Sequence, residues 1–137
     1  MAAADAEVLR SLYAAFASLS RGHDVAAYVD AFYDADCEYH PVEEVEVVRG
    51  RDAMVRWNRR WFEAWTELQV DVDDMTEVGS SVVASLTVRA RGVESGLDIS
   101  QRIFHPLELR DGRVVRMREY VDRAEALEAA GASGVGE

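Results

Sequence analysis

Residues 97–122 read LDISQRIFHPLELRDGRVVRMREYVD, and the main sheet can be worked out from them. Two runs rich in β-formers flank Arg110–Asp111–Gly112, and a three-residue loop with glycine in the left-handed position is a common hairpin turn. This turn predicts that Leu109 lies opposite Arg113, so that odd-numbered residues face odd-numbered residues. The period-two pattern then gives an apolar face and a charged face. The apolar face carries Ile103, Leu107, Leu109, Val115, Met117 and Val121, and the charged face carries Arg102, Glu108, Arg110, Arg116 and Arg118.

Two polar residues, His105 and Glu119, interrupt the apolar face of this hairpin. In the predicted register they are diagonal neighbours, at about 7–8 Å between backbones, which long side chains can bridge. A histidine and a carboxylate on the buried side of a sheet indicate either a working site or a pair that satisfies itself, and the pair alone favours neither. A carboxylate in apolar surroundings tends to have a raised pKa, which suits a general base or acid near neutral pH.

The composition indicates one compact domain, because 49% of the 137 residues are hydrophobic. We expect the domain to cover residues 1–130 and a disordered tail to cover 131–137. The net charge of −11 argues against nucleic acid or an anionic membrane as partner. The single cysteine, Cys37, excludes an internal disulfide and indicates an inert, partly buried thiol. Without a signal peptide, or an apolar run of about 20 residues, we expect a soluble cytoplasmic protein.

Three helices are predicted before the main sheet, over about 2–20, 24–33 and 51–65, from apolar residues at three- and four-residue spacing. In the third, Met54, Trp57, Trp61 and Trp65 form one stripe, and Asn58 falls inside it. A buried amide must be hydrogen-bonded, so Asn58 either satisfies a neighbouring backbone group or lines a pocket.

A short extended segment, 36–40, follows the second helix and ends at Pro41. Cys37 and Tyr39 alternate there with Glu38 and His40, and either pair can face inward. The acidic segment 43–50 that comes next is a connector or a small edge strand.

Strands are predicted over 67–77 and 82–90, and they lead into the hairpin as consecutive antiparallel neighbours. The sequence Asp122–Arg–Ala–Glu125 is a capping-box pattern that begins a short C-terminal helix, with Leu127 on its buried side. This capping role is sufficient to explain Asp122.

The predicted fold is α+β, with a curved antiparallel sheet wrapped around three helices and a short helix at the C-terminus. Such a sheet encloses a conical cavity. We expect its walls to be formed by apolar and aromatic side chains together with one amide, namely Phe16, Tyr28, Phe32, Trp57, Asn58, Trp61, Met117 and Val121.

Four local patterns, in this order, resemble the SnoaL-like family of the nuclear-transport-factor-2-like (NTF2-like) superfamily. They are FYDADCEYHPV, VVRGRDAMVRW, RARGVESG and LRDGRVVRMREYVDRAEALEAAG, and the resemblance covers about residues 5–130. It implies an α+β cone that often dimerises through the outer face of the sheet. Three apolar residues on the otherwise charged outer face fit a homodimer of this kind: Phe104, Pro106 and Tyr120.

The superfamily includes ketosteroid isomerases, polyketide cyclases, epoxide hydrolases, dehydratases and non-catalytic binding modules, so the fold does not decide the function. The resemblance matches His40 to the base of the isomerases and His105 to their oxyanion-stabilising acid. Phe16 falls where the isomerases carry the tyrosine that stabilises the oxyanion, which implies that the hydrogen bond from this tyrosine is missing. Glu119 corresponds to the catalytic aspartate of the epoxide hydrolases, and Asp122 to that of the polyketide cyclases.

The candidate catalytic residues are therefore His40, His105, Glu119 and Asp122. They suit cofactor-independent acid–base chemistry, namely cyclisation, isomerisation or hydration of a hydrophobic carbonyl, polyketide or epoxide compound. The histidines and Glu119 lack the tight spacing of metal ligands, so we expect no metal. The alternative is a non-catalytic module for binding a hydrophobic ligand or for dimerisation.

Overall fold

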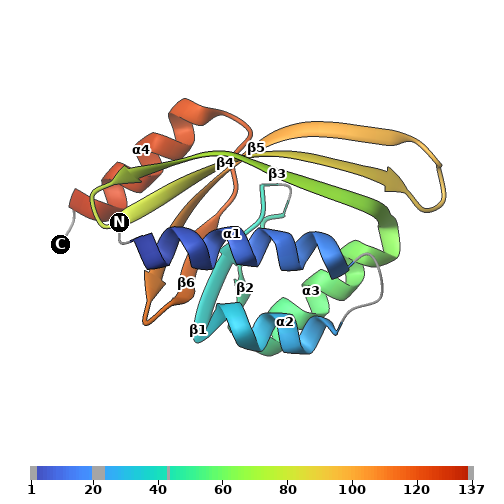
Figure 1. The fold of residues 1–137 in the computed structure, drawn as a ribbon, viewed down its shortest axis with the longest axis horizontal. Coiled ribbons are helices and arrows are strands. Elements are labelled where there is room, and N and C mark those ends of the chain that lie inside the picture. Colours follow the sequence, from blue (N-terminus) through green and yellow to red (C-terminus); the bar gives the residue numbers. More distant parts are fainter. Residues whose placement is uncertain (1–2, 20–23, 43, 136–137) are drawn as a thin grey trace.

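The computed structural model describes residues 3–19, 24–42 and 44–135 (Figure 1). Three helices and two short strands come first, then a four-stranded meander and a last helix, which is the predicted order. The elements are α1 (Ala3–Ser18), α2 (Val25–Phe32), β1 (Tyr33–His40), β2 (Val48–Arg49), α3 (Gly50–Ala64), β3 (Trp65–Val78), β4 (Ser81–Gly92), β5 (Asp98–Arg110), β6 (Arg113–Arg118) and α4 (Arg123–Val135).

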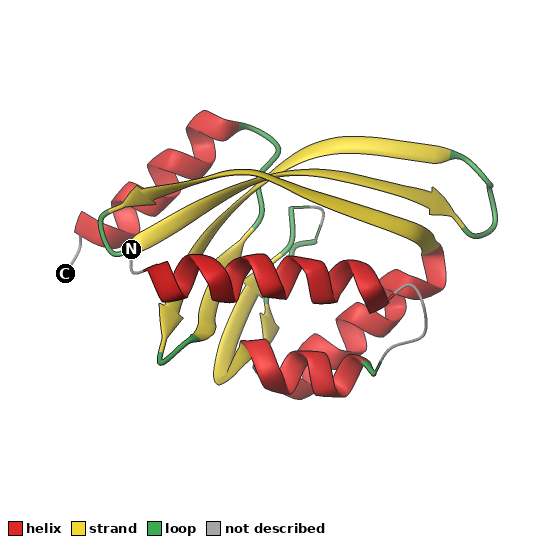
Figure 2. Ribbon diagram, in the orientation of Figure 1, coloured by secondary structure: helices red, strands yellow, loops and turns green. Residues whose placement is uncertain are grey.

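The six strands form one curved sheet in the order β2-β1-β6-β5-β4-β3. All neighbours are antiparallel except β1 and β6, which run parallel, so the predicted antiparallel sheet contains one parallel pair. Helices α1, α2 and α3 lie on the concave side of the sheet, whereas α4 lies across the opposite side of the long strands (Figure 2). The predicted α+β cone is therefore confirmed.

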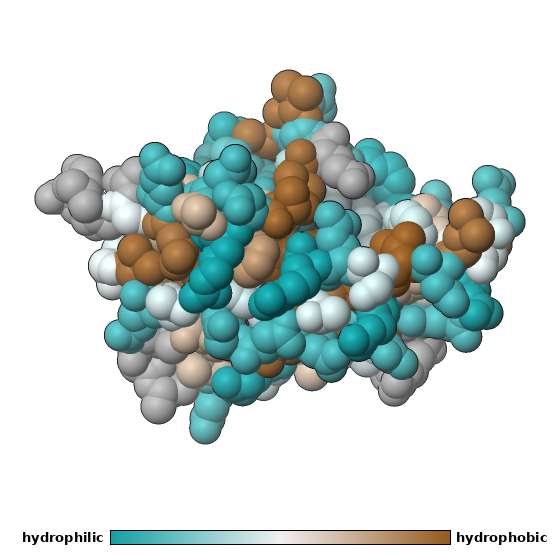
Figure 3. Space-filling view, turned by 90° about the horizontal axis from the view of Figure 1, so that it is seen from above, coloured by the Kyte–Doolittle hydropathy of each residue, from teal (hydrophilic) through white to brown (hydrophobic). Residues whose placement is uncertain are grey.

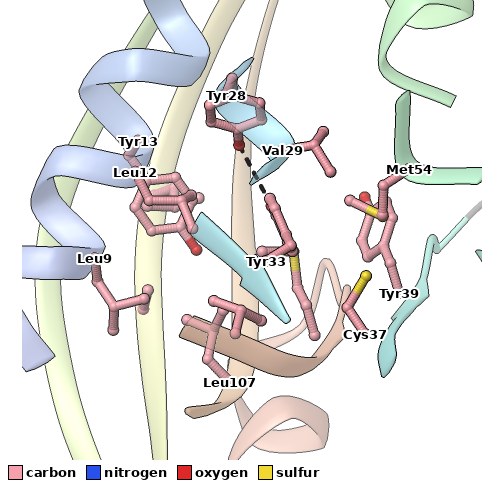
Figure 4. Packing of buried hydrophobic residues seen from close by; sticks show 14 of the residues in the cluster. Leu9, Leu12, Tyr13, Tyr28, Val29, Tyr33, Cys37, Tyr39, Met54 and Leu107 are labelled. Atoms are coloured by element: carbon pink, nitrogen blue, oxygen red, sulfur yellow. Dashed lines mark hydrogen bonds between the residues drawn. The ribbon is translucent and has the colours of Figure 1, made fainter. Parts of the chain in front are cut away.

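The main core fills the space between the three inner helices and the sheet. Side chains from α1, α2, β1 and α3 converge there, as Figure 4 shows. Leu9 and Leu12 of α1 meet Met54 of α3 and Leu107 of β5 in this core, and each is at most 1% exposed. Full burial of such a side chain contributes about 1.5–3 kcal/mol, so this layer holds the helices against the sheet.

The turn between β5 and β6 differs from the predicted three-residue loop. It has two residues, Asp111 and Gly112, whose φ angles of 53° and 75° are those of a type I′ turn. The shorter loop shifts the register by one residue, so Leu109 lies opposite Val114. Val114 is fully buried, whereas the sequence pattern had placed Val115 on the inner face.

A second irregularity, after Glu108, shifts the pairing by one more residue. Beyond it Phe104 pairs with Tyr120, and the same register places Glu119 directly opposite His105. The sequence had predicted these two residues to be diagonal neighbours. The two shifts together restore odd-to-odd pairing but bring the acid and the imidazole closer than the predicted register does.

On the outer face, α4 covers the apolar residues that had suggested a dimer interface. Phe104 and Val83 form a second buried cluster with Ala126 and Ala130 of α4, and Tyr120 packs against it. The face seen in Figure 3 has hydrophilic side chains between its apolar groups. The homodimer therefore stays a prediction. Phe104 and Tyr120 no longer support it, because they pack against α4 of the same chain.

The last helix, α4, continues to Val135, so the segment 131–137 that was predicted to be disordered is helical as far as that residue. Residues 136–137 lie outside the described part of the chain. The helix extends because alanine, the best helix former, is its commonest residue, and each of its two glycines costs only about 1 kcal/mol. None of the described helices has the length and hydropathy needed to span a bilayer.

Candidate functional site

A cavity of about 300 Å³ lies between the inner helices and the concave face of the sheet. Its apolar wall includes most of the predicted residues, namely Phe16, Tyr28, Trp57, Asn58, Trp61 and Met117. Its polar groups include His105 and Glu119, as well as three tyrosines that the sequence did not single out: Tyr13, Tyr33 and Tyr39.

His40 does not line this cavity. On β1 the buried residues are Tyr33, Cys37 and Tyr39, so the alternation turns Glu38 and His40 to the other face of the sheet. The His40 side chain is 37% exposed, and its Nε2 atom lies 4.0 Å from the Glu38 carboxylate. Partial burial, followed by the charges of neighbouring arginines such as Arg118, lowers the pKa of His40. His40 therefore cannot transfer a proton within the cavity.

Asp122 caps α4 instead of facing the cavity. Its Oδ2 atom accepts a hydrogen bond of 3.1 Å from the backbone N–H of Glu125, and its carbonyl accepts one of 3.2 Å from Ala126. These bonds satisfy two backbone donors in the first turn of the helix. Capping alone accounts for an aspartate at this position.

Val121 and Phe32 are also absent from the cavity lining, contrary to prediction. Val121 is 49% exposed, because the chain leaves the sheet after β6 and has turned towards α4. Phe32 packs behind the wall, with its ring centroid 5.6 Å from that of Tyr28.

The polar centre of the cavity is His105, at 7% exposure. Its Nδ1 atom lies 2.7 Å from the Tyr13 hydroxyl, and its Nε2 atom lies 3.0 Å from Oε2 of Glu119. The rings of Tyr13 and His105 are stacked, with centroids 5.8 Å apart and an angle of 21° between their planes. Helix α1 and the β5–β6 region thus contribute to one linear chain of hydrogen bonds, Tyr13–His105–Glu119.

Glu119 accepts two further hydrogen bonds. The Tyr39 hydroxyl donates to Oε2 at 2.9 Å, and the backbone N–H of Val42 donates to Oε1 at 3.3 Å. Burial acts to raise the pKa of Glu119, but the hydrogen bond and charge of His105, with the bonds from Tyr39 and Val42, outweigh it and lower the pKa. This corrects the expectation of a raised pKa, because the sequence could not show these donors.

The state of His105 follows from the ionised Glu119. A carboxylate can only accept, so the Nε2 atom carries a proton and donates it to Glu119. In the neutral imidazole, Nδ1 then accepts from the Tyr13 hydroxyl. In the imidazolium, Nδ1–H donates to the Tyr13 oxygen, and the phenolic hydrogen is released for another acceptor.

The resemblance placed Phe16 where the isomerases carry their oxyanion tyrosine, and it did not consider Tyr13. Tyr13 lies one helical turn before Phe16 on α1, and its hydroxyl group is bonded to His105. Its position three residues before Phe16 put it next to the apolar stripe. That spacing is the sequence signal that could have identified it.

The hydroxyl groups of the four cavity tyrosines are neutral donors. Burial is the largest cause that raises the pKa of Tyr13, Tyr28, Tyr33 and Tyr39 above the ordinary value. Among the residues that the structure describes, every buried side-chain nitrogen or oxygen has a hydrogen-bond partner. The cavity therefore presents hydrogen-bonded hydroxyl groups within an aromatic wall.

Asn58 satisfies its own helix, which is one of the two predicted possibilities. Its Nδ2 group donates to the carbonyl of Met54 at 2.8 Å, and the residue also belongs to the cavity wall. In the described ranges, no group of three or more histidine, cysteine, aspartate or glutamate side chains is arranged to hold a metal ion.

Solved structures with similar folds cover nearly the whole chain. A protein from Jannaschia sp. CCS1 assigned as a SnoaL-like polyketide cyclase is 18% identical, with a TM-score of 0.75. The alignment covers 94% of this chain and 92% of that one. A protein from Bacillus subtilis assigned as an isomerase is 20% identical, with a TM-score of 0.72 and coverage of 96% and 94%.

A third similar structure is an LEH-like epoxide hydrolase from M. tuberculosis, which is 18% identical, with a TM-score of 0.69 and coverage of 97% of this chain and 92% of that one. At these identities the likeness shows the fold alone. No curated protein matches the sequence.

A family model adds evidence from the sequence itself. The model of the SnoaL-like domain matches residues 9–117, a stretch that includes Tyr13, His105 and the strands from β1 to β5, and that ends within β6. The chain therefore belongs to the SnoaL-like domain family, within the NTF2-like superfamily.

Proposed function

We propose that this chain is a cofactor-independent enzyme that moves a proton to or from an oxygen of a hydrophobic carbonyl, polyketide or epoxide compound. The observation that carries the proposal is the chain of hydrogen bonds Tyr13–His105–Glu119, which faces an aromatic cavity. Cyclisation, isomerisation through an enol and hydration all fit, because each needs a proton to move at an oxygen atom of the substrate.

Tyr13 is the group that meets the substrate in this proposal. When His105 is an imidazolium, its Nδ1–H bonds the Tyr13 oxygen and frees the phenolic hydrogen for a substrate carbonyl or epoxide oxygen. As the substrate oxygen takes that proton, Tyr13 takes one from Nδ1 and is restored. The reverse sequence removes a proton from an attacking hydroxyl group or water.

Glu119 keeps its negative charge throughout. Its lowered pKa makes it a weak base but a strong partner for the imidazolium, which is otherwise costly in a buried site. In this proposal Tyr13 donates the hydrogen bond to the substrate, His105 stores and returns the proton, and Glu119 balances the charge of the imidazolium. The sequence has no lysine, so a covalent imine with a carbonyl substrate has no lysine amine to form on.

The alternative is a module that binds a hydrophobic ligand without changing it. Each buried side-chain nitrogen or oxygen in the described part of the chain has at least one hydrogen-bond partner, which favours this alternative, since a bonded network can serve stability alone. The experiment must therefore separate binding from turnover.

The test is exchange of oxygen from ¹⁸O-labelled water into a panel of hydrophobic ketones, aldehydes and epoxides, followed by mass spectrometry. Reversible hydration exchanges a carbonyl oxygen, and epoxide opening retains one labelled oxygen in the diol, so the assay needs no knowledge of the natural substrate. We expect the wild type to accelerate incorporation for at least one compound. Tyr13→Phe should slow that reaction by about 10²-fold or more, as loss of a general acid does.

The matched control is Tyr120→Phe, which removes a hydroxyl from a tyrosine packed near α4, outside the cavity lining. It should keep the wild-type rate. Equal rates in the wild type and Tyr13→Phe would remove Tyr13 from the mechanism. Compounds that bind, as judged by a thermal shift, but show no accelerated exchange would establish the binding module instead.

A further inference from the structure

Two more tyrosines of the cavity play no part in the Tyr13–His105–Glu119 chain. Tyr28 comes from α2 and Tyr33 from the start of β1, and both line the cavity while being only 6% and 3% exposed. Their hydroxyl oxygens lie 3.3 Å apart, and Figure 4 shows the two groups pointing at each other. This pair is a second polar point on the cavity wall, apart from the Tyr13–His105–Glu119 chain.

The pair has one hydrogen more than it uses. Two hydroxyl groups carry two hydrogens, and the bond between them uses one. Each oxygen counts as partnered through that one bond. In the described part of the chain no acceptor is bonded to the second hydrogen, so one O–H group remains available on the cavity wall.

We propose that the Tyr28–Tyr33 pair is a second ligand-binding point that donates a hydrogen bond to an oxygen of the compound held at Tyr13. The preferred ligand then has two oxygen acceptors on one apolar skeleton, such as a diketone or a polyketide fragment. This inference rests on the proposed function and deepens it, because it names the feature of the substrate that the site selects.

The physical reason for selection is the cost of covering a buried donor. A compound with a single oxygen excludes water from the Tyr28–Tyr33 pair and leaves the spare hydroxyl without an acceptor. A second oxygen on the compound accepts that hydrogen bond in place of water. Burial keeps both phenols neutral, as the raised pKa of each indicates, so the pair offers a hydrogen to an acceptor and carries no charge for a cation. A matched second oxygen should therefore tighten binding by roughly tenfold or more.

The test compares compounds that share one bicyclic skeleton. The affinity of 1-decalone, which has a single carbonyl, is measured by calorimetry beside those of the 1,4-, 1,5- and 1,8-diones of decalin, which place the second carbonyl at different distances. The proteins are the wild type, the double variant Tyr28→Phe/Tyr33→Phe and the control Tyr120→Phe. The double variant should fold, because removing both partners of a buried hydrogen bond without changing the shape is nearly neutral.

We expect at least one dione to bind the wild type and Tyr120→Phe at least tenfold more tightly than 1-decalone does. The double variant should lose that advantage while its affinity for 1-decalone stays within about threefold of wild type. The single variants Tyr28→Phe and Tyr33→Phe then show which hydroxyl donates to the ligand.

Diones that bind no better than 1-decalone, or an advantage that survives in the double variant, would overturn this inference while leaving the proposed function intact. If neither the ketone nor any dione binds the wild type, the inference fails together with the proposed hydrophobic carbonyl ligand. The two failures are thus distinguishable by the behaviour of 1-decalone alone.

Discussion

His105 is held at both ring nitrogens, and this is what gives the site a defined chemistry. Glu119 fixes the proton on Nε2, so the only freedom left is whether Nδ1 accepts from Tyr13 or donates to it. A proton added to or removed from this imidazole therefore changes what the Tyr13 hydroxyl presents to the cavity. The function argued above depends on this one link.

At this scale the first prediction concerns Tyr39, whose hydroxyl donates to Glu119 at 2.9 Å. Replacing it in Tyr39→Phe removes one of the groups that lower the pKa of Glu119, so that pKa should rise. A titration of the glutamate side chains by ¹³C NMR measures the change directly. Tyr120→Phe serves as control, and an unchanged Glu119 titration in Tyr39→Phe would contradict the bonding pattern.

The sequence predicted the meeting of His105 and Glu119 but not their partners. Both lie on one hairpin, where alternation places them on the same face. Tyr13, by contrast, is 92 positions away from His105 along the chain, and only the packing of α1 against the sheet brings it there. His40 was misplaced for a related reason, because the burial of Cys37 and Tyr39 sets the facing of β1 and local alternation alone cannot.

At the scale of elements, the turn between β5 and β6 sets the register that brings Glu119 opposite His105. Gly112, at a φ of 75°, can be tested by Gly112→Ala. An added Cβ would meet no atom within 4 Å, so the whole cost is that of a left-handed conformation in a residue with a side chain. We expect the free energy of unfolding in urea to fall by about 1–2 kcal/mol.

The matched comparison for this turn is Asp111→Gly, since Asp111 also has a positive φ, of 53°. Glycine relieves that conformation, so this variant should be as stable as the wild type or more so. If Gly112→Ala proved harmless, the left-handed conformation of Gly112, and with it the type I′ turn, would be wrong.

The start of α4 gives a second prediction at this scale, because Asp122 was a candidate catalytic residue and is found as a helix cap. Asp122→Ala should lower the free energy of unfolding by about 1 kcal/mol, whereas Asp122→Asn, which can still accept the bond, should be close to wild type. Neither change should alter the affinity for 1-decalone. Loss of ligand binding in Asp122→Asn would return this residue to the site.

Patterns of spacing predicted the elements well and their pairing less well. The stripe of Met54, Trp57 and Trp61 predicted α3, and the alternation of apolar residues predicted β4 from 82 to 90. The register of β5 with β6 was wrong, because the turn is one residue shorter than predicted and the irregularity after Glu108 adds one residue to β6. Both changes depend on backbone conformation, which residue patterning does not specify.

For the molecule as a whole, Glu119 joins separate parts of the fold. It bonds β1 through Tyr39, the loop after β1 through Val42, and α1 through His105 and Tyr13. Its pKa is lowered in the folded state, so its ionisation stabilises the fold above the pKa of the unfolded chain, about 4.3. This stability is lost as the pH falls through the lower, folded-state pKa.

The charge of Glu119 should therefore make the stability of the fold depend on pH in the acid range. The difference in unfolding free energy between the wild type and Glu119→Gln should be largest near pH 7 and should shrink as the pH falls below about 4. Urea titrations from pH 3 to pH 7 measure it. A difference that is independent of pH would show that the charge of Glu119 contributes nothing to the fold.

The overall cone could be predicted because each helix and strand carries its own apolar face, and a curved sheet over three helices buries all of them. The cavity could be predicted as a consequence of that shape. The side chains that reach the cavity could not all be predicted. The direction of the chain after β6 excludes Val121, and packing against Tyr28 excludes Phe32.

The most direct measurement is ¹⁵N NMR of the three histidines at pH 7, recorded with and without 1-decalone. The account predicts that His105 carries a proton on Nε2 and that the ligand shifts its Nδ1 resonance in the wild type but not in Tyr13→Phe. An unprotonated Nε2 on His105, or an Nδ1 resonance that does not shift when the ligand binds, would contradict the claim that His105 controls hydrogen bonding by the Tyr13 hydroxyl in the cavity.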